Sequence, residues 1–205
     1  MKSYQYKNYD HYIESQKEAN RKKSKNVWAV EENIKAICDY INKNYAIPMP
    51  LKGLCHGTRG GHEQKWFMKY IYDSKVIGSE IGDASAPNTV QHDFNKIKPE
   101  WIDEFDFIYS NSFDHSYDPA TTFNIWCNQL KSGGLLILEY DKRNEHTGEV
   151  SKSVNKTDPN SITIEELIVL IPQWFAGAEV IDVIDLPVIK KEFQKAIIVQ
   201  VQHAN

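Results

Sequence analysis

A glycine-rich turn between an apolar run and an amphipathic helix pattern is the feature that most constrains how this chain folds. Residues 54–63 are Leu-Cys-His-Gly-Thr-Arg-Gly-Gly-His-Glu. Glycines at a strand-to-helix turn let the backbone approach a ligand closely, and the N-terminus of the following helix offers unpaired N–H groups. The turn therefore predicts a doubly wound α/β fold that holds a nucleotide-like cofactor.

Size, charge and cysteine content narrow the class of protein. The 205 residues suffice for a domain with a hydrophobic core, and the net charge of −4 disfavours broad binding to nucleic acid. No apolar run approaches the roughly 18 residues that span a bilayer, and the first residues lack the apolar core of a signal peptide. Three cysteines, Cys38, Cys55 and Cys127, lack zinc spacing and indicate reduced core thiols in a cytoplasmic protein. We expect a small-molecule substrate and no membrane partner, while the oligomeric state stays open.

From residue 51 onward, short apolar runs alternate with amphipathic helix patterns. The five runs that predict parallel strands are Leu51–Cys55, Lys75–Glu80, Thr89–Phe94, Phe105–Ser110 and Leu135–Glu139. Two further runs, Glu179–Leu186 and Lys195–Gln202, are joined by a short charged link and predict an antiparallel hairpin at the sheet edge. The expected fold class is α/β: a Rossmann-like, doubly wound, mostly parallel seven-stranded sheet with an antiparallel C-terminal hairpin and an N-terminal helical extension.

Capping residues set the expected helix boundaries in the second half of the chain. Asp118 followed by a proline predicts an N-cap and first turn, and the Ser-Gly-Gly at 132–134 predicts the end of that helix. Thr163 and Glu166 have capping-box spacing, and the helix that they begin reaches Pro172 or just past it. Residues 141–161 are polar and aperiodic, which predicts a long loop of the kind that often covers a site.

Residues 1–48 predict a helical extension or lid, separate from a main domain at 49–205. Apolar residues recur at helical spacing from Val30 to Ile41. The early tyrosines, from Tyr4 to Tyr12, either pack over the mouth of the site or anchor this extension. The basic run at 21–25 is either a solvated helix face, which we favour, or a contact for phosphates or an acidic substrate.

The order of these elements and the motifs at the strand ends resemble a class I S-adenosylmethionine-dependent methyltransferase over about residues 50–202. Glycines follow the first strand, an acid ends the second, and Gly133-Gly134 precedes the fifth. Glu80 follows the turn at close to the roughly 20 residues expected of an acid that binds ribose hydroxyls. Two positions depart from the family: Cys55 stands where its first-strand acid lies, and Arg59 replaces the middle glycine.

The resemblance implies a set of residues for binding S-adenosylmethionine. The glycine-rich turn supplies Gly57, Thr58, Arg59 and Gly61, and the end of the second strand supplies Glu80 and Ile81. The end of the third strand supplies Asp93 and Phe94, and the exit of the fourth strand supplies Asn111. Each has a purely structural alternative: the glycines as a turn without a ligand, Glu80 as a solvated strand end, and Phe94 as a core residue. Glu63 either pairs with Arg59, reaches the amino group of the cofactor, or complements the helix dipole.

Methyl transfer to a hydroxyl requires alignment of the nucleophile and removal of a proton. His115 has a pKa range suited to that base, and Asp114 is placed to orient it; the alternative is an exposed surface imidazole. The Asn-Pro-Pro-Tyr and Asp-Pro-Pro-Tyr motifs of amino-methylating relatives are absent from the sequence, which disfavours methylation of an exocyclic base amine. The stretch Phe113-Asp114-His115-Ser116-Tyr117 instead resembles the corresponding stretch of small-molecule O-methyltransferases, so the resemblance favours an oxygen acceptor. Some small-molecule relatives bind a divalent ion, for which Asp114 and Asp141 are candidates, but we assign no metal site.

The sequence therefore predicts a methyltransferase acting on a small-molecule or sugar-like acceptor. Two alternatives remain open: a dehydrogenase or other nucleotide-binding Rossmann-like protein, and a non-catalytic module that kept the fold. Acceptor specificity is expected in the first 45 residues and in the 141–161 loop.

Overall fold

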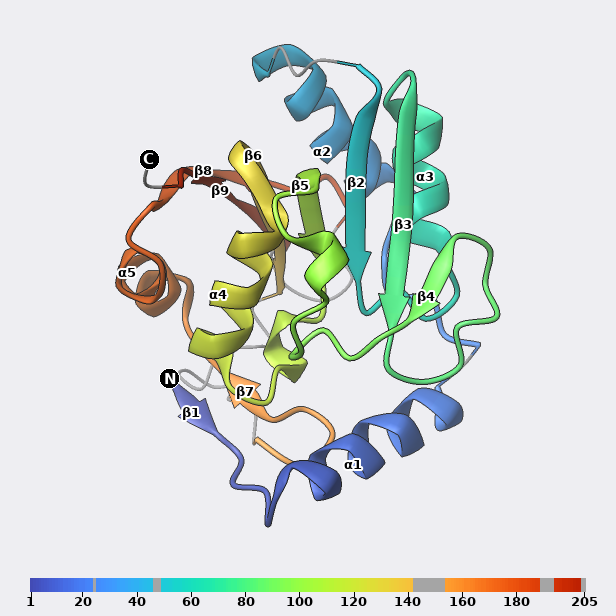
Figure 1. Cartoon of the computed structure of the whole chain (residues 1–205), viewed down its shortest axis with the longest axis vertical. Coiled ribbons are helices and arrows are strands. Elements are labelled where there is room, and N and C mark those ends of the chain that lie inside the picture. Colours follow the sequence, from blue (N-terminus) through green and yellow to red (C-terminus); the bar gives the residue numbers. More distant parts are fainter. Residues whose placement is uncertain (24, 46–48, 142–153, 189–193, 204–205) are drawn as a thin grey trace.

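The computed structural model describes residues 1–23, 25–45, 49–141, 154–188 and 194–203. Within these ranges, seven strands form one sheet in the order β4-β3-β2-β5-β6-β9-β8 (Figure 1). The bounds of these strands are β2 Leu51–His56, β3 Ser74–Glu80, β4 Thr89–Gln91, β5 Phe105–Ser110, β6 Leu130–Asp141, β8 Ala178–Asp185 and β9 Gln194–Val201. The first five strands in this order, β4, β3, β2, β5 and β6, pair in parallel. Strand β9 pairs antiparallel with both β6 and β8. The predicted fold class, including the C-terminal hairpin, is confirmed.

Strand β2 lies at the centre of the parallel region, between β3 on one side and β5 on the other. Leu54 of β2 is in register with Ile77 of β3 and with Ile108 of β5. The chain moves outward from β2 to β3 and β4, then returns to β5, so the strand order reverses here. In open α/β sheets, ligands bind at the carboxyl ends of the strands at this switch point.

Helices cover both faces of the sheet. The helices of the described chain are α1 Tyr9–Lys22, α2 Glu31–Asn44, α3 His62–Tyr70, α4 Pro119–Gln129 and α5 Ile164–Trp174, with short 3-10 turns η1 Pro99–Trp101 and η2 Phe113–His115. Successive residues of β5 serve opposite faces: Phe107 and Tyr109 pack with α2 and α3, while Ile108 packs with α4 and α5. This burial on both faces explains why the strands are apolar runs rather than alternating patterns.

The predicted capping signals are confirmed. The Asp118 side chain accepts a hydrogen bond from the Thr121 N–H over 2.9 Å at the start of α4. Thr163 and Glu166 form a reciprocal capping box, and α5 passes Pro172 by two residues. The three cysteines are buried and free, as expected of core thiols.

Two strand boundaries differ from the prediction by three residues or more. Strand β4 ends at Gln91 rather than at position 94, because the Asp93 side chain accepts the Asn95 N–H and forms a turn. Strand β6 begins at Leu130, immediately after α4, because the backbone around Gly133 (φ +85°) forms an irregularity in the pairing with β5 instead of ending the helix.

The N-terminal segment is attached to the main sheet in two ways. Strand β1 (Lys2–Ser3) pairs antiparallel with β7 (Asn160–Ser161), and α1 lies across the carboxyl ends of β2 and β3 (Figure 1). Helix α2 buries Ile34, Ile37 and Ile41 in the core that α3 also covers. Most of the expected 141–161 loop, residues 142–153, lies outside the described ranges. No helix in the described ranges is both long and apolar enough to cross a membrane.

Candidate functional site

The turn after β2 has the conformation that its glycines predict. Gly57 has φ +75°, and a Cβ at this position would lie 2.8 Å from the Ser112 Cβ. Gly61 has φ +71° at the N-cap of α3, and a Cβ there would lie 3.0 Å from the Ala86 Cβ. The positive φ values and the contact with Ser112 require glycine, and they bring the turn close to the exit of β5.

Glu80 lies directly beside this turn. The N–H of Arg59 donates a hydrogen bond to Glu80 Oε2 over 3.0 Å, and the N–H of Gly82 donates to Oε1 over 3.1 Å. Only 4% of Glu80 is exposed. The carboxylate at the end of β3 and the backbone of the turn therefore share one site at the switch point.

Behind the turn, His56 is held in a buried polar contact. Its ring lies 2.7 Å (Nδ1) from Ser79 Oγ and 2.9 Å (Nε2) from Gln129 Oε1, and it stacks on Trp126. Because an amide oxygen only accepts, Nε2 carries the proton and Nδ1 accepts from the serine hydroxyl. Burial lowers the pKa of His56 to about 3. His56 is therefore a neutral structural residue.

Two neighbouring cavities lie along the carboxyl ends of the strands. The larger has a volume of about 460 Å³, within the range of about 300–1,000 Å³ typical of ligand sites, and the smaller about 60 Å³. Residues that line both cavities are Lys23, Gly57, Arg59, Ser112 and His115. The cavities are thus two parts of one site that meet at Arg59 and His115.

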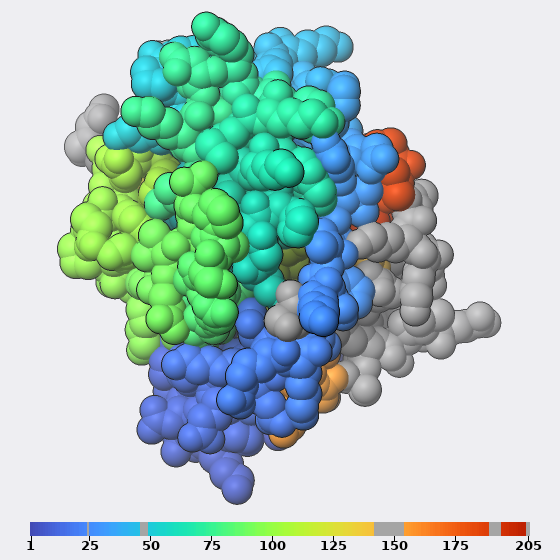
Figure 2. All heavy atoms as spheres, turned by 90° about the vertical axis from the view of Figure 1, so that its right-hand side faces the viewer, coloured from blue at the N-terminus to red at the C-terminus, as the bar shows by residue number. Residues whose placement is uncertain are grey.

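The smaller cavity contains the residues predicted to bind an adenosyl group. Glu80, Ile81, Asp93 and Phe94 line it, and α1 covers it with residues that include Tyr12. In Figure 2 the blue N-terminal segment, which includes α1, lies against the green segment that contains β4 and its flanking loops.

Two tyrosines of α1 form hydrogen bonds that hold this helix over the smaller cavity. The Tyr9 hydroxyl donates a hydrogen bond to Asp93 Oδ2, and burial together with this carboxylate raises the pKa of Tyr9. The Tyr12 hydroxyl accepts from Asn95 Nδ2 over 2.7 Å and donates to the His115 carbonyl over 3.1 Å. The early tyrosines therefore both cover the site and anchor α1.

The larger cavity contains most of the charged groups. Thr58 and Asn111 of the predicted set line it, and the acidic residues that line it are Glu63, Asp114, Glu139, Asp141 and Asp158. Among the described residues, the basic ones that line it, besides histidines, are Lys23 and Arg59. At 6% exposure, Glu63 is desolvated, which raises its pKa to about 7.

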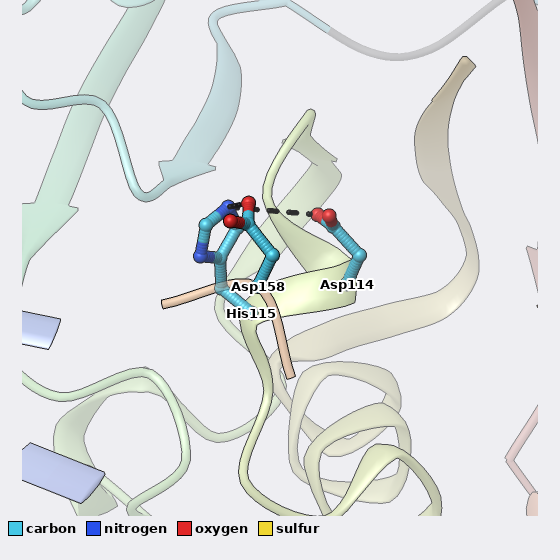
Figure 3. A group of neighbouring side chains, drawn as sticks. All are labelled: Asp114, His115 and Asp158. Carbon is cyan, nitrogen blue, oxygen red and sulfur yellow. Dashed lines mark ion pairs between the residues drawn. The ribbon is translucent and has the colours of Figure 1, made fainter. Parts of the chain in front are cut away.

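His115 lies beside two carboxylates, those of Asp114 and Asp158 (Figure 3). Its Nε2 lies 3.9 Å from Asp114 Oδ1 and 3.8 Å from Asp158 Oδ1. These three side chains offer ligand atoms within 4.8 Å of one another, a spacing that a metal ion could use. Asp141, the other candidate ligand considered from the sequence, is not in this group of described residues.

A residue of α1 orients the imidazole. His115 Nδ1 lies 3.3 Å from Gln16 Oε1, and the Gln16 amide nitrogen donates to the Tyr6 hydroxyl over 3.2 Å. The amide oxygen therefore faces the imidazole and accepts the Nδ1 proton. This leaves Nε2 as the basic nitrogen, on the side of Asp114 and Asp158.

The geometry can be compared with known proteins. No protein-family profile and no curated protein sequence matches this chain. The crystal structure of Burkholderia thailandensis 1,6-didemethyltoxoflavin-N1-methyltransferase, with bound 1,6-didemethyltoxoflavin and S-adenosylhomocysteine, is similar with a TM-score of 0.72 at 14% identity, covering 95% of this chain and 89% of that one. A SAM-dependent methyltransferase from Aquifex aeolicus has a TM-score of 0.57 at 16% identity, with coverage of 84% and 99%. The chain has the class I methyltransferase fold.

The cyclase SpnF has the same architecture, with a TM-score of 0.65 at 11% identity and coverage of 83% and 81%. Identities this low establish the methyltransferase fold alone, and the chemistry must be argued from the site.

Within the methyltransferase fold, the structure brings ten of the eleven predicted residues to the two cavities. Gly61 lines neither and instead begins α3. Lys23, Asp158 and Gln194 also line the larger cavity but were not among the residues predicted from the sequence. The basic run was the available signal for Lys23, and the predicted 141–161 loop was the signal for Asp158. Gln194 carried none, because it reaches the site only through tertiary contacts.

Proposed function

We propose that this chain is an S-adenosylmethionine-dependent methyltransferase that transfers a methyl group to an oxygen atom of a small molecule. The observation that carries the proposal is the hydrogen bond from the Arg59 N–H to Glu80. It joins a carboxylate and a glycine turn on adjoining parallel strands at the switch point, which is the arrangement that holds a nucleoside in such folds.

The residues present fit the cofactor. Glu80 is placed for ribose hydroxyls, with Ile81, Asp93 and Phe94 around the adenine. Arg59 lines both cavities, and its Nε is a buried donor that no acceptor in the described ranges satisfies. A carboxylate such as that of the cofactor would satisfy it. These assignments, like those of Thr58 and Asn111, rest on position.

The chain itself supplies alignment and a base. S-adenosylmethionine, when bound, supplies a methyl group already activated on a sulfonium sulfur, so the C–S bond breaks as the C–O bond forms. His115 Nε2 is the basic nitrogen, and we assign it to accept the proton of the acceptor hydroxyl. Asp114 and Asp158, at 3.9 and 3.8 Å, stabilise the imidazolium that results.

Helix α1 covers the smaller cavity and therefore affects how the cofactor enters it. A volume of about 60 Å³ is too small for an adenosyl group. We infer that α1 moves aside when the cofactor binds and then shields the site from water. The buried, free cysteines are consistent with a location in the reducing cytoplasm.

The same small volume favours a second candidate, a non-catalytic protein whose cofactor site is filled by α1 side chains. Thermal-shift and calorimetric titration with S-adenosylhomocysteine separates the two candidates. The methyltransferase is expected to be stabilised in proportion to ligand concentration. We expect Glu80→Gln to weaken S-adenosylhomocysteine binding by about tenfold or more. The control is Asp83→Asn, which changes an exposed carboxylate in the loop after β3 and should leave this binding unchanged. Protection by NADH alone, or by neither ligand, would contradict the proposal.

A further inference from the structure

Two buried polar atoms of opposite kind, one donor and one acceptor, belong to residues that line the larger cavity. They are Arg59 Nε and Glu63 Oε2, and neither has a hydrogen-bond partner within the described ranges. The two atoms therefore do not bond to each other. Only 6% of Glu63 is exposed. Buried polar groups are nearly always hydrogen-bonded, and an unsatisfied one carries a free-energy cost, so the two atoms indicate a ligand that both accepts and donates hydrogen bonds.

Both residues belong to the site that is predicted to hold the cofactor. Arg59 lies in the glycine-rich turn, and Glu63 lies in the first turn of α3. Burial lowers the pKa of Arg59, and the carboxylates of Glu80 and Glu63 oppose that shift. The two carboxylates are therefore both close enough to this guanidinium to interact with it electrostatically. Glu63 is thus a neighbour of the residue pair that carries the proposed function.

The two carboxylates nevertheless line different parts of the site. Glu80 lines the smaller cavity, where the ribose and adenine are predicted, whereas Glu63 lines the larger one and Arg59 lines both. Glu63 therefore belongs to the part of the site beyond the ribose. At that end S-adenosylmethionine carries a sulfonium, a carboxylate and an ammonium group. Of these three, only the ammonium group donates hydrogen bonds.

Strand β2 offers no carboxylate for this ammonium group. Cys55, at the position where the sequence departs from the family by lacking an acid, is fully buried in the core that α3 covers. It is not among the described residues that line either cavity. Burial raises the pKa of the Cys55 thiol, and the Glu63 carboxylate raises it further. The Glu63 carboxylate therefore lies near the place on β2 where an acid is missing.

We propose that Glu63 binds the α-ammonium group of S-adenosylmethionine through Oε2, while Arg59 binds the α-carboxylate. The proposal rests on the proposed function, because it identifies a further cofactor-binding residue of the same site. An ammonium group satisfies the acceptor and a carboxylate satisfies the donor, each through a charge-assisted hydrogen bond. The pair recognises the amino-acid end of the cofactor, and holding both groups orients the sulfur that carries the methyl group.

Ammonium binding at Glu63 is coupled to a proton. Burial raises the pKa of Glu63 to about 7, so most of this carboxyl is protonated at pH 6 in the free protein. A neighbouring positive charge favours the ionised form, so binding of the ammonium group releases the proton. The ionisable groups that interact with Glu63 come from the turn and from four strands: Arg59, Cys55 of β2, Glu80 of β3, Tyr109 of β5 and Glu139 of β6. Burial holds the pKa values of Cys55 and Tyr109 well above their usual range, so neither releases a proton near pH 6.

The test is calorimetric titration of the full chain at pH 8 with S-adenosylhomocysteine and with its analogue in which hydrogen replaces the α-amino group. We expect the wild-type protein to bind S-adenosylhomocysteine at least about tenfold more tightly than the deamino analogue. Glu63→Gln should weaken binding of S-adenosylhomocysteine by about tenfold and change binding of the deamino analogue by less than about twofold. The control is Glu165→Gln, on the exposed surface of α5, which should bind both ligands as the wild type does.

A second measurement needs no variant. Titration of the wild-type protein at pH 6, in buffers of different ionisation enthalpy, measures the protons that binding releases. We expect S-adenosylhomocysteine to release about one proton more than the deamino analogue, because only the former brings a positive charge to Glu63.

Two results would overturn this inference alone, because S-adenosylhomocysteine still binds in both. Equal affinity of the wild-type protein for the two ligands, with equal proton release, would show that the ammonium group is not recognised. An equal loss of affinity for both ligands in Glu63→Gln would assign this carboxylate a structural role. Absence of binding by both ligands would overturn the inference together with the proposed function.

Discussion

The Tyr9 hydroxyl donates a hydrogen bond to the Asp93 carboxylate, and this contact fastens α1 over the cavity predicted to hold the adenosyl group. The two residues are 84 positions apart in the chain. Asp93 also accepts from the Asn95 N–H over 3.0 Å, which holds the carboxylate in place. The residue expected to contact adenine is therefore already hydrogen-bonded to the cover.

Tyr9→Phe removes the hydroxyl that closes this cover and should speed cofactor binding. A hydrogen bond to a charged group contributes about 1.5–3 kcal/mol, so we expect the association rate of S-adenosylhomocysteine to rise by about tenfold. Stopped-flow tryptophan fluorescence measures the rate, and Tyr72→Phe, at an 87% exposed position, is the control. An unchanged association rate with intact binding would show that α1 does not limit access.

His115→Ala should remove the base while leaving cofactor binding intact. General-base catalysis contributes about 10²–10⁴-fold, so we expect turnover to fall within that range and affinity for S-adenosylhomocysteine to change by less than about twofold. The measurement is S-adenosylhomocysteine formation across pH with an acceptor found by screening small molecules that carry a hydroxyl group. His203→Ala, two residues past the end of β9, is the control. Retained turnover in His115→Ala would mean that the acceptor needs no base.

His56 should make the protein sensitive to mild acid. The pKa of His56 is about 3 in the folded state, whereas its ordinary value is 6.5. Between pH 3 and pH 6.5, the unfolded chain therefore binds a proton at His56 that the folded state does not. Stability is therefore lost as pH falls below about 6.5, by up to about 1.4 kcal/mol per pH unit. Urea unfolding between pH 7 and 5 measures the slope, which His56→Gln should reduce. Equal slopes in the two proteins would contradict the buried neutral state.

Glu63 should have the opposite pH dependence. Burial raises its pKa to about 7, above the ordinary value of 4.5, so the folded state holds the proton more tightly than the unfolded chain. The stability that this proton supplies is present at low pH and is lost as pH rises through 7. We expect Glu63→Gln to stabilise the protein by up to about 3 kcal/mol at pH 8 and by little at pH 4, as measured by urea unfolding. Destabilisation of Glu63→Gln at pH 8 would show that the carboxylate has an unrecognised partner.

The sequence predicted the parallel sheet, its hairpin and the cap of α5 because each depends on residues close together in the chain. Thr163 and Glu166 are three positions apart, and this capping-box spacing predicted the start of α5. The apolar run at 105–110 predicted β5 with the bounds that the structure has. The third strand was predicted too long because the β-branched residues before Gln91 gave no sign that the Asp93 side chain would form a turn.

The candidate site was predicted only in part for the same reason. Glu80 was found because an acid at a strand end is a local signal, and the structure places it 3.0 Å from the Arg59 nitrogen. Asp158 lies 3.8 Å from His115 although 43 positions separate them, and nothing near Asp158 in the sequence indicates that contact.

The chain's own order of residues thus determined which segments become strands and helices, where the glycine turn lies, and which strand ends carry acids. Only the tertiary structure decided that α1 covers the carboxyl ends of the sheet, that Glu63 is buried with an oxygen that no donor of the described residues satisfies, and that Gln194 of β9 lies in the same cavity wall. Hydrophobic period and turn chemistry act over a few residues, whereas burial and partnering of a polar atom depend on which distant segments pack around it.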